Sequence, residues 1–168
     1  MRRFIFALLM FAFQFAPTVA QSQWREFRSD ADGFVVALPQ TPEITSRRIG
    51  TSTATQTNFL IENGSLTYLV SVIQLEKGKG PKNPDQAYFQ NLMKNYVEGS
   101  TTKLRTSKLA TIAGKPGIDG ISEAGNSVHQ VQILAAGDRI YMVVYVGPKG
   151  QETSADPVRY RESFKLTN

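Results

Sequence analysis

The fold follows from residues 117–147, which read GIDGISEAGNSVHQVQILAAGDRIYMVVYVG. Residues 125–126 (Gly-Asn) and 137–138 (Gly-Asp) each place glycine first in a two-residue turn, an order that suits the type II′ turns of antiparallel hairpins. The segments around these turns are rich in the β-branched and aromatic residues that strands favour. The stretch therefore predicts three consecutive antiparallel strands, with Ala136 paired with Arg139.

This register sorts the side chains of the last two strands onto two faces. One face is apolar and is expected to lie in the core, because register is set by which face can be buried. The other face is amphipathic, so we expect it either to be partly covered by a helix or to be an exposed sheet surface with aromatic character. The apolar face carries Val131, Ile133, Ala135, Ile140, Met142, Val144 and Val146, and the amphipathic face carries Gln130, Gln132, Leu134, Tyr141, Val143 and Tyr145.

The rest of the chain adds strands and two helices. One amphipathic helix is expected to begin at Asn83-Pro84 and end at Gly99, and a short second helix is expected to open at Ser154. Asn63-Gly64 is a strong hairpin signal. It is expected to set Ile61, Phe59 and Thr57 beside Leu66, Tyr68 and Val70. Further strands are expected at residues 24–29, 34–38, 44–49, 53–61, 66–75 and 104–112. The predicted fold class is α+β, an antiparallel sheet flanked by helices.

The N-terminus has the pattern of a secretory signal peptide. Arg2 and Arg3 precede an apolar run over residues 4–16, and small residues around Ala20 suit signal peptidase. The run is shorter than the ~20 residues that a membrane-spanning helix needs. We therefore expect a leader at residues 1–20, a single domain at 21–168, no integral membrane span after cleavage, and a periplasmic or secreted bacterial protein.

Composition excludes several kinds of site. The chain has no cysteine and a single histidine, so cysteine catalysis is excluded and a transition-metal site is not expected. A Gly-Lys-Gly segment at residues 78–80 lacks the spacing of a phosphate-binding loop. Modest net charge and the expected export argue against nucleic-acid binding. No cofactor is expected.

His129, the single histidine of the chain, is a candidate general base. It faces Val146 on the next strand and Ser122 across the preceding turn, and it is expected to be packed or hydrogen-bonded as a structural residue. The alternative is an uncharacterised hydrolase in which His129 would activate Ser122 or Ser127.

Four motifs lie at turns and core positions over nearly the whole predicted mature chain. They are Trp24-x-x-Phe27-x-Ser29-x-x-x-Gly33-Phe34-x-Val36-x-Leu38-Pro39-x-x-Pro42, Gly114-x-Pro116-Gly117, Asp138-Arg139-Ile140-Tyr141 and Glu162-Ser163-Phe164-Lys165-Leu166. Together they resemble the PsbP-like superfamily, in particular its small exported bacterial members of unknown function. The resemblance implies an α/β/α sandwich and a non-enzymatic accessory or binding role. The chain departs from lipid-anchored bacterial relatives in having no cysteine.

Basic residues are concentrated in the middle third of the chain, residues 77–115, where the only acidic residues are Asp85 and Glu98. We therefore expect a non-catalytic periplasmic accessory protein that docks on an envelope protein or on an anionic membrane or cell-wall surface. The alternative is a small-molecule or lipid-binding protein with a cleft between sheet and helix. The expected partner-binding residues are Lys77, Lys79, Lys82, Lys103, Arg105, Lys108, Tyr141 and Tyr145.

Overall fold

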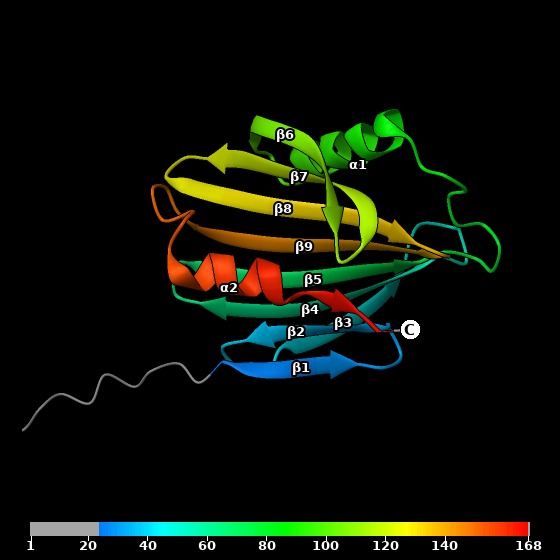
Figure 1. Ribbon diagram of the computed structural model, residues 1–168, viewed down its shortest axis with the longest axis horizontal. Helices are drawn as coiled ribbons and strands as arrows, with labels where there is room; N and C mark the ends of the chain where they lie inside the picture. Colours follow the sequence, from blue (N-terminus) through cyan, green and yellow to red (C-terminus); the bar gives the residue numbers. More distant parts are fainter. Residues whose placement is uncertain (1–23, 168) are drawn as a thin grey trace, which may run out of the picture.

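A computed structural model describes residues 24–167, and the predicted signal peptide lies outside this range. Seven antiparallel strands form a large sheet in the order β3-β4-β5-β9-β8-β7-β6, and β1, β2 and β10 form a small sheet of their own (Figure 1). The α+β class is confirmed, but the first two strands do not join the large sheet. The elements are β1 (Arg25–Ser29), β2 (Phe34–Leu38), β3 (Glu43–Arg48), β4 (Thr55–Asn63), β5 (Leu66–Gln74), α1 (Gln86–Gly99), β6 (Lys103–Ile112), β7 (Lys115–Ala124), β8 (Ser127–Ala136), β9 (Arg139–Pro148), α2 (Ala155–Ser163) and β10 (Lys165–Leu166).

The predicted meander is confirmed in its register. Ala136 pairs with Arg139, and His129 pairs with both Val146 and Ser122. Gly125 and Gly137 have φ of 55° and 58°, as the first position of a type II′ turn requires. These two tight turns fix β7, β8 and β9 as consecutive neighbours in the middle of the molecule.

The hairpin between β4 and β5 differs from the prediction by one turn position. Asn63 pairs with Leu66, so the turn is Gly64-Ser65, and Ile61 lies opposite Tyr68 instead of Leu66. Gly64 has φ of 61°, so glycine again comes first in the turn, as in the other two hairpins. Because each pairing moves by two residues, the side chains keep their faces and the core is unchanged.

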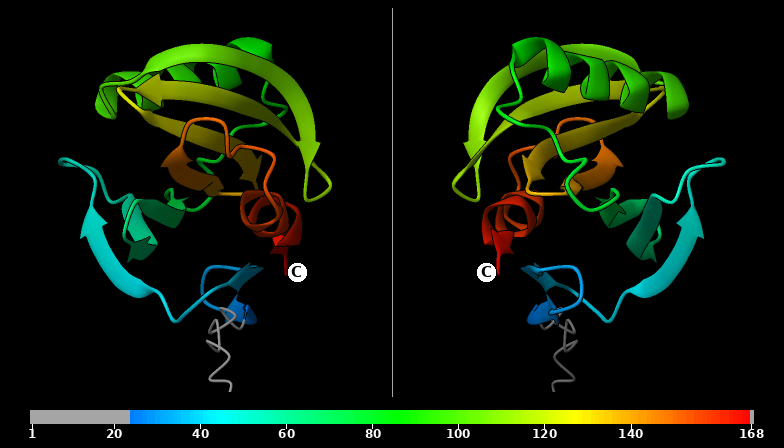
Figure 2. Two further views of the ribbon diagram at one scale, coloured as in Figure 1. Left: turned by 90° about the vertical axis from the view of Figure 1, so that its left-hand side faces the viewer. Right: turned by 90° about the vertical axis from the view of Figure 1, so that its right-hand side faces the viewer.

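The large sheet is curved and lies between two other layers (Figure 2). Helix α1 packs on its convex face, around the buried side chains of Phe89 and Met93. The concave face holds α2 and the small sheet, with Tyr160 and Phe34 fully buried against it. The apolar face predicted from the register is the one beneath α1. Helices on both faces give the expected α/β/α arrangement.

Helix α1 begins two residues later than predicted. Asp85, not Asn83, is its N-cap, and the Asp85 carboxylate accepts a hydrogen bond from the backbone N–H of Tyr88 at 2.8 Å. Asn83 has φ of 54°, which is outside the helical region. The predicted end holds, since Gly99 is the last helical residue, and Ser154 is the N-cap of α2 as expected.

Candidate functional site

The basic residues expected to bind a partner fall into two groups. Lys77, Lys79 and Lys82 lie in the connection between β5 and α1, whereas Lys103 lies at the start of β6 beside Glu123. The first group is attached to the turn after β8, and the second lies near the turn before β8. A ten-residue strand separates them, about 30 Å at 3.3 Å per residue. The loop lysines and Lys103 therefore lie toward opposite ends of β8, and Lys108 lies between them along β6, opposite Asp119.

The loop that carries Lys77 and Lys79 is attached to the turn between β8 and β9. The Asp138 carboxylate accepts hydrogen bonds from the backbone N–H groups of Gly78 and Gly80, both at 2.8 Å. These bonds lower the pKa of the Asp138 carboxyl group. A Cβ atom at Gly80 would lie 1.9 Å from the Gly137 carbonyl oxygen, so only glycine permits this close approach.

Tyr141 and Tyr145 cannot contact a partner, which corrects the predicted site. Their side chains are 2% and 1% exposed, because the concave face on which they lie is covered by α2 and the small sheet. The sequence left two possibilities open for this face of the sheet. The prediction that other elements cover it is correct, and the alternative of an exposed aromatic surface is wrong. Tyr145 packs on Tyr68 with ring centroids 5.5 Å apart, within an aromatic core.

Strand β6 is one edge of the large sheet, and β7 is its sheet neighbour. Its register shifts between Leu104 and Thr106, which marks a β-bulge at Arg105. Leu104 and Leu109 are five residues apart and would face opposite sides of a regular strand. The bulge instead places them opposite Ser122 and Ile118, on the face that carries α1.

Beside these leucines, α1 and β6 enclose a groove. One hollow of about 350 Å³ contains Leu104 with Met93 and Val97 of α1, and another of about 580 Å³ contains Leu109 with Phe89. Leu104 and Leu109 are 47% and 50% exposed, which is unusual for leucine in a folded domain. We call the outer edge of β6 together with these two hollows the docking edge.

The other face of β6 carries the basic side chains. Lys103 and Lys108 are exposed there, opposite Glu123 and Asp119 of β7. Arg105 donates to Glu123 at 2.8 Å and to Glu152 at 3.1 Å, and these bonds raise the pKa of its guanidinium group. The charge of Arg105 is thus compensated within the protein, whereas Lys103 and Lys108 form no ion pair within the described residues.

Sequence reasoning identified the lysines of this edge but missed its leucines. A five-residue Leu-Leu spacing in a predicted strand is a usable signal, because it implies either one exposed leucine or a bulge that returns both to one face. The bulge itself has no glycine to mark it.

His129 is half-buried and hydrogen-bonded. Its Nδ1 lies 2.7 Å from the hydroxyl oxygen of Tyr96 on α1, and burial lowers the pKa of the imidazole. Ser122 is fully buried, and its hydroxyl accepts a hydrogen bond from Thr102 at 3.0 Å. The histidine therefore connects the sheet to α1.

Within residues 24–167, no group of three His, Asp or Glu side chains is placed to hold a metal ion. No helix in the same range is long and apolar enough to cross a bilayer.

The fold has counterparts among solved structures. The chain is similar to the cyanobacterial PsbP (CyanoP) of Synechocystis sp. PCC 6803, with 10% sequence identity, a TM-score of 0.56, and coverage of 90% of this chain and 96% of that one. This chain has a PsbP-like fold. A structure from Bacteroides thetaiotaomicron shares 11% identity over 87% of this chain and 49% of its own, with a TM-score of 0.41. No protein-family model and no curated protein matches the sequence.

Proposed function

We propose that this chain is a non-catalytic accessory protein that works outside the cytoplasm and docks on an envelope partner through β6. An extended segment of the partner would add to the large sheet as an eighth strand, next to β6. The observation that carries this proposal is the docking edge, where exposed leucines and exposed lysines lie on opposite faces of a single edge strand.

The two faces of β6 specify the chemistry of the segment. An added strand points alternate side chains to opposite faces of the sheet, so one set would enter the groove beside Leu104 and Leu109. The other set would lie beside Lys103 and Lys108, where acidic side chains gain a favourable interaction. The expected segment is therefore about ten residues long, the length of β6, and alternates apolar with acidic side chains.

The opposite edge of the sheet fits a partner less well. Strand β3 is also exposed, but its exposed Ile44 is a single apolar residue and neither of the helices in residues 24–167 lies beside it. The guanidinium group of Arg47 is bonded to Gln56 on the neighbouring strand, at 2.9 Å and 3.2 Å. Only β6 combines a free edge with an apolar groove and unpaired cations among the described strands.

Export is the second part of the proposal. The pattern of residues 1–20 supports it, since the charged start, short apolar run and small residues are those of a cleaved leader. Export would bring the mature chain to the cell envelope, where the proposed partner lies.

A small molecule or lipid is the alternative ligand for the same groove. It would bind in the larger hollow beside Phe89.

Binding of a synthetic peptide tests the docking proposal. The probe is a fluorescent ten-residue peptide of alternating valine and glutamate, titrated with protein and followed by anisotropy. Wild type is expected to bind saturably, more weakly as salt is raised. Lys103→Glu with Lys108→Glu should weaken binding about tenfold, because two exposed charge pairs become repulsive. Leu109→Ser should weaken it by a similar factor through lost apolar contact.

The chain offers a matched control for this experiment. Lys77→Glu with Lys79→Glu makes the same charge change at the other end of the sheet and should leave binding unchanged. A peptide with alternate backbone amides N-methylated should fail to bind, since strand addition needs its N–H groups. Equal loss in the two double variants, or full binding of the methylated peptide, would contradict strand addition at β6.

A further inference from the structure

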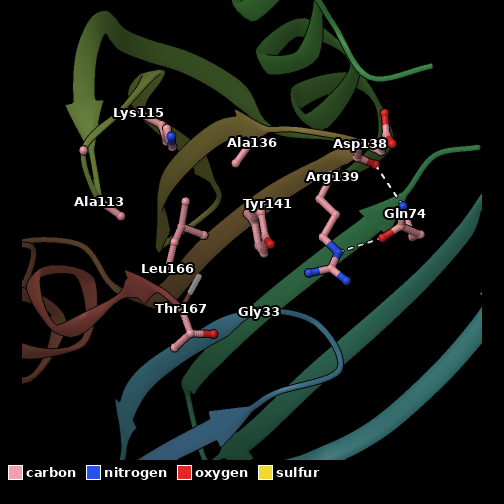
Figure 3. Close-up of a pocket in the computed structure, with 11 residues that line it drawn as sticks. Gly33, Gln74, Ala113, Lys115, Ala136, Asp138, Arg139, Tyr141, Leu166 and Thr167 are labelled. Carbon is pink, nitrogen blue, oxygen red and sulfur yellow. Dashed lines mark hydrogen bonds between the residues drawn. The ribbon is translucent and has the colours of Figure 1, made fainter. Parts of the chain in front are cut away.

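Another concavity lies on the concave face of the large sheet and meets the docking edge at the tip of the β6–β7 hairpin. Its volume is about 600 Å³, within the range of small-molecule sites. The tip of the β6–β7 hairpin forms one side, and the C-terminal strand with Gly33 forms the other (Figure 3). The floor is the start of β9, with Arg139 and Tyr141. We call this concavity the β9 cleft.

Arg139 is held in a fixed orientation in the β9 cleft. Its Nε donates to Gln74 Oε1 at 2.7 Å, and its Nη2 donates to the Ala31 carbonyl oxygen at 2.8 Å. A Cβ atom at Gly33 would lie 2.6 Å from Nη1, so glycine at this position, with φ of 71°, makes room for the guanidinium group. The two bonds use two of the five N–H donors of arginine and leave others for a ligand.

Lys115 supplies a second cation from a different element. It is the first residue of β7, is exposed, and lines the cleft beside Ala113 and Gly114 of the hairpin tip. Figure 3 shows Lys115 and Arg139 at separate sides of the same hollow, with the Tyr141 ring between them. Lys115 forms no ion pair with any residue in the described range.

The acidic groups around the cleft already have partners. Asp138 is the only carboxylate among the lining residues, and it accepts both backbone N–H groups of Gly78 and Gly80. Asp32 lies nearby, where its backbone oxygen accepts from the Tyr141 hydroxyl at 2.9 Å and its carboxylate accepts from Ser29 at 2.7 Å. The lining of the cleft thus carries two cations, Arg139 and Lys115, against one carboxylate that is already hydrogen-bonded.

We infer that the β9 cleft binds a small anionic molecule through a carboxylate or phosphate group. Arg139 would meet the anion with its planar fork, which matches both groups, and Lys115 would close on it from the hairpin tip. Lys115 is exposed and would contribute little alone, but Arg139 is partly buried, and an anion between them would contact both cations. The β9 cleft and the docking edge meet at Gly114, which lines both, but Lys115 and Arg139 line only the β9 cleft.

Calorimetric titration of the protein with succinate and, separately, with inorganic phosphate tests this inference and distinguishes the two ligand classes. Wild type is expected to bind one of them at one site per chain, with a dissociation constant of about 1 mM or tighter. Lys115→Gln should weaken that binding about tenfold, because a charge-assisted contact is lost. Arg139→Lys should also weaken it, since lysine keeps the charge but lacks the fork.

Lys165→Gln is the matched control, because Lys165 is an exposed cation next to Leu166 that does not line the cleft. Its affinity should equal that of wild type. No saturable binding of either anion, or equal weakening by Lys165→Gln and Lys115→Gln, would overturn the inference. The variant with Lys103→Glu and Lys108→Glu should bind the anion normally, which separates failure of this site from failure of docking.

Discussion

At the residue scale, His129 shows how far one side chain could be understood from the sequence. Its strand partners Val146 and Ser122 followed from turn chemistry alone, and both are observed. The hydrogen bond to Tyr96 could not be predicted, because α1 and β8 are far apart in the sequence and their contact depends on how the helix packs. The register of neighbouring strands is set by the local sequence of their turns, whereas the position of a helix on the sheet depends on tertiary packing.

The lowered pKa of His129 predicts a pH-dependent stability. Burial lowers the pKa in the folded state below the unfolded value of about 6.5, so folding is favoured fully above that pH. As pH falls through 6.5 toward the folded-state pKa, the unfolded chain takes up the proton first and stability decreases. Urea denaturation between pH 8 and pH 5 should show this loss in wild type and less of it in His129→Gln.

Tyr96→Phe is the control for this experiment. It removes the hydroxyl group but leaves the imidazole packed between sheet and helix, so the slope of stability against pH should persist. The carboxylates with lowered pKa, such as Asp138 and Glu123, titrate at lower pH and should not interfere. Parallel pH profiles for wild type and His129→Gln would contradict this explanation.

At the element scale, α2 is attached to the sheet by an ion pair that the sequence does not reveal. Arg161 Nη2 lies 2.7 Å and 2.6 Å from the two carboxylate oxygens of Asp119 on β7, and both side chains are mostly buried. The residues are 42 positions apart. The predicted cap at Ser154 placed the helix correctly along the chain, but only the fold shows which face of the sheet it covers.

Breaking this pair should destabilise the protein. Asp119→Asn leaves the Arg161 guanidinium group largely buried without its counter-charge, and the cost should be about 1.5–3 kcal/mol in the free energy of unfolding. Lys94→Gln, which removes an exposed 3.8 Å pair with Glu98, should cost no more than about 0.5 kcal/mol. Equal costs in urea denaturation would show that the Asp119 pair is no more than a surface contact.

At the scale of the whole molecule, the sequence predicted the layers better than their contacts. The hairpins and the two helices followed from local signals, whereas the α/β/α arrangement was implied by the PsbP-like resemblance. The small sheet did not follow from local signals, because β10 has only two residues, and pairing of Leu166 with Phe34 joins opposite ends of the chain. The burial of Tyr141 and Tyr145 follows from that same long-range closure, and so the predicted aromatic docking face was wrong.

The docking edge also becomes visible only in the whole molecule. Its lysines were predicted as part of a larger basic set, but the sheet separates that set and leaves Lys103 and Lys108 on β6. Its groove exists because α1 covers the neighbouring strands and stops short of the outer edge, while the bulge at Arg105 turns both leucines toward the helix.

Backbone hydrogen exchange with and without the alternating valine-glutamate peptide tests the central claim most directly. Strand addition at β6 predicts that amides of Lys103–Ile112 gain protection when the peptide binds, because outward N–H groups acquire partners. Amides of Glu43–Arg48, in the opposite edge strand β3, should exchange as before. Peptide binding that protects β3 as much as β6, or that leaves β6 unprotected, would contradict the proposed docking.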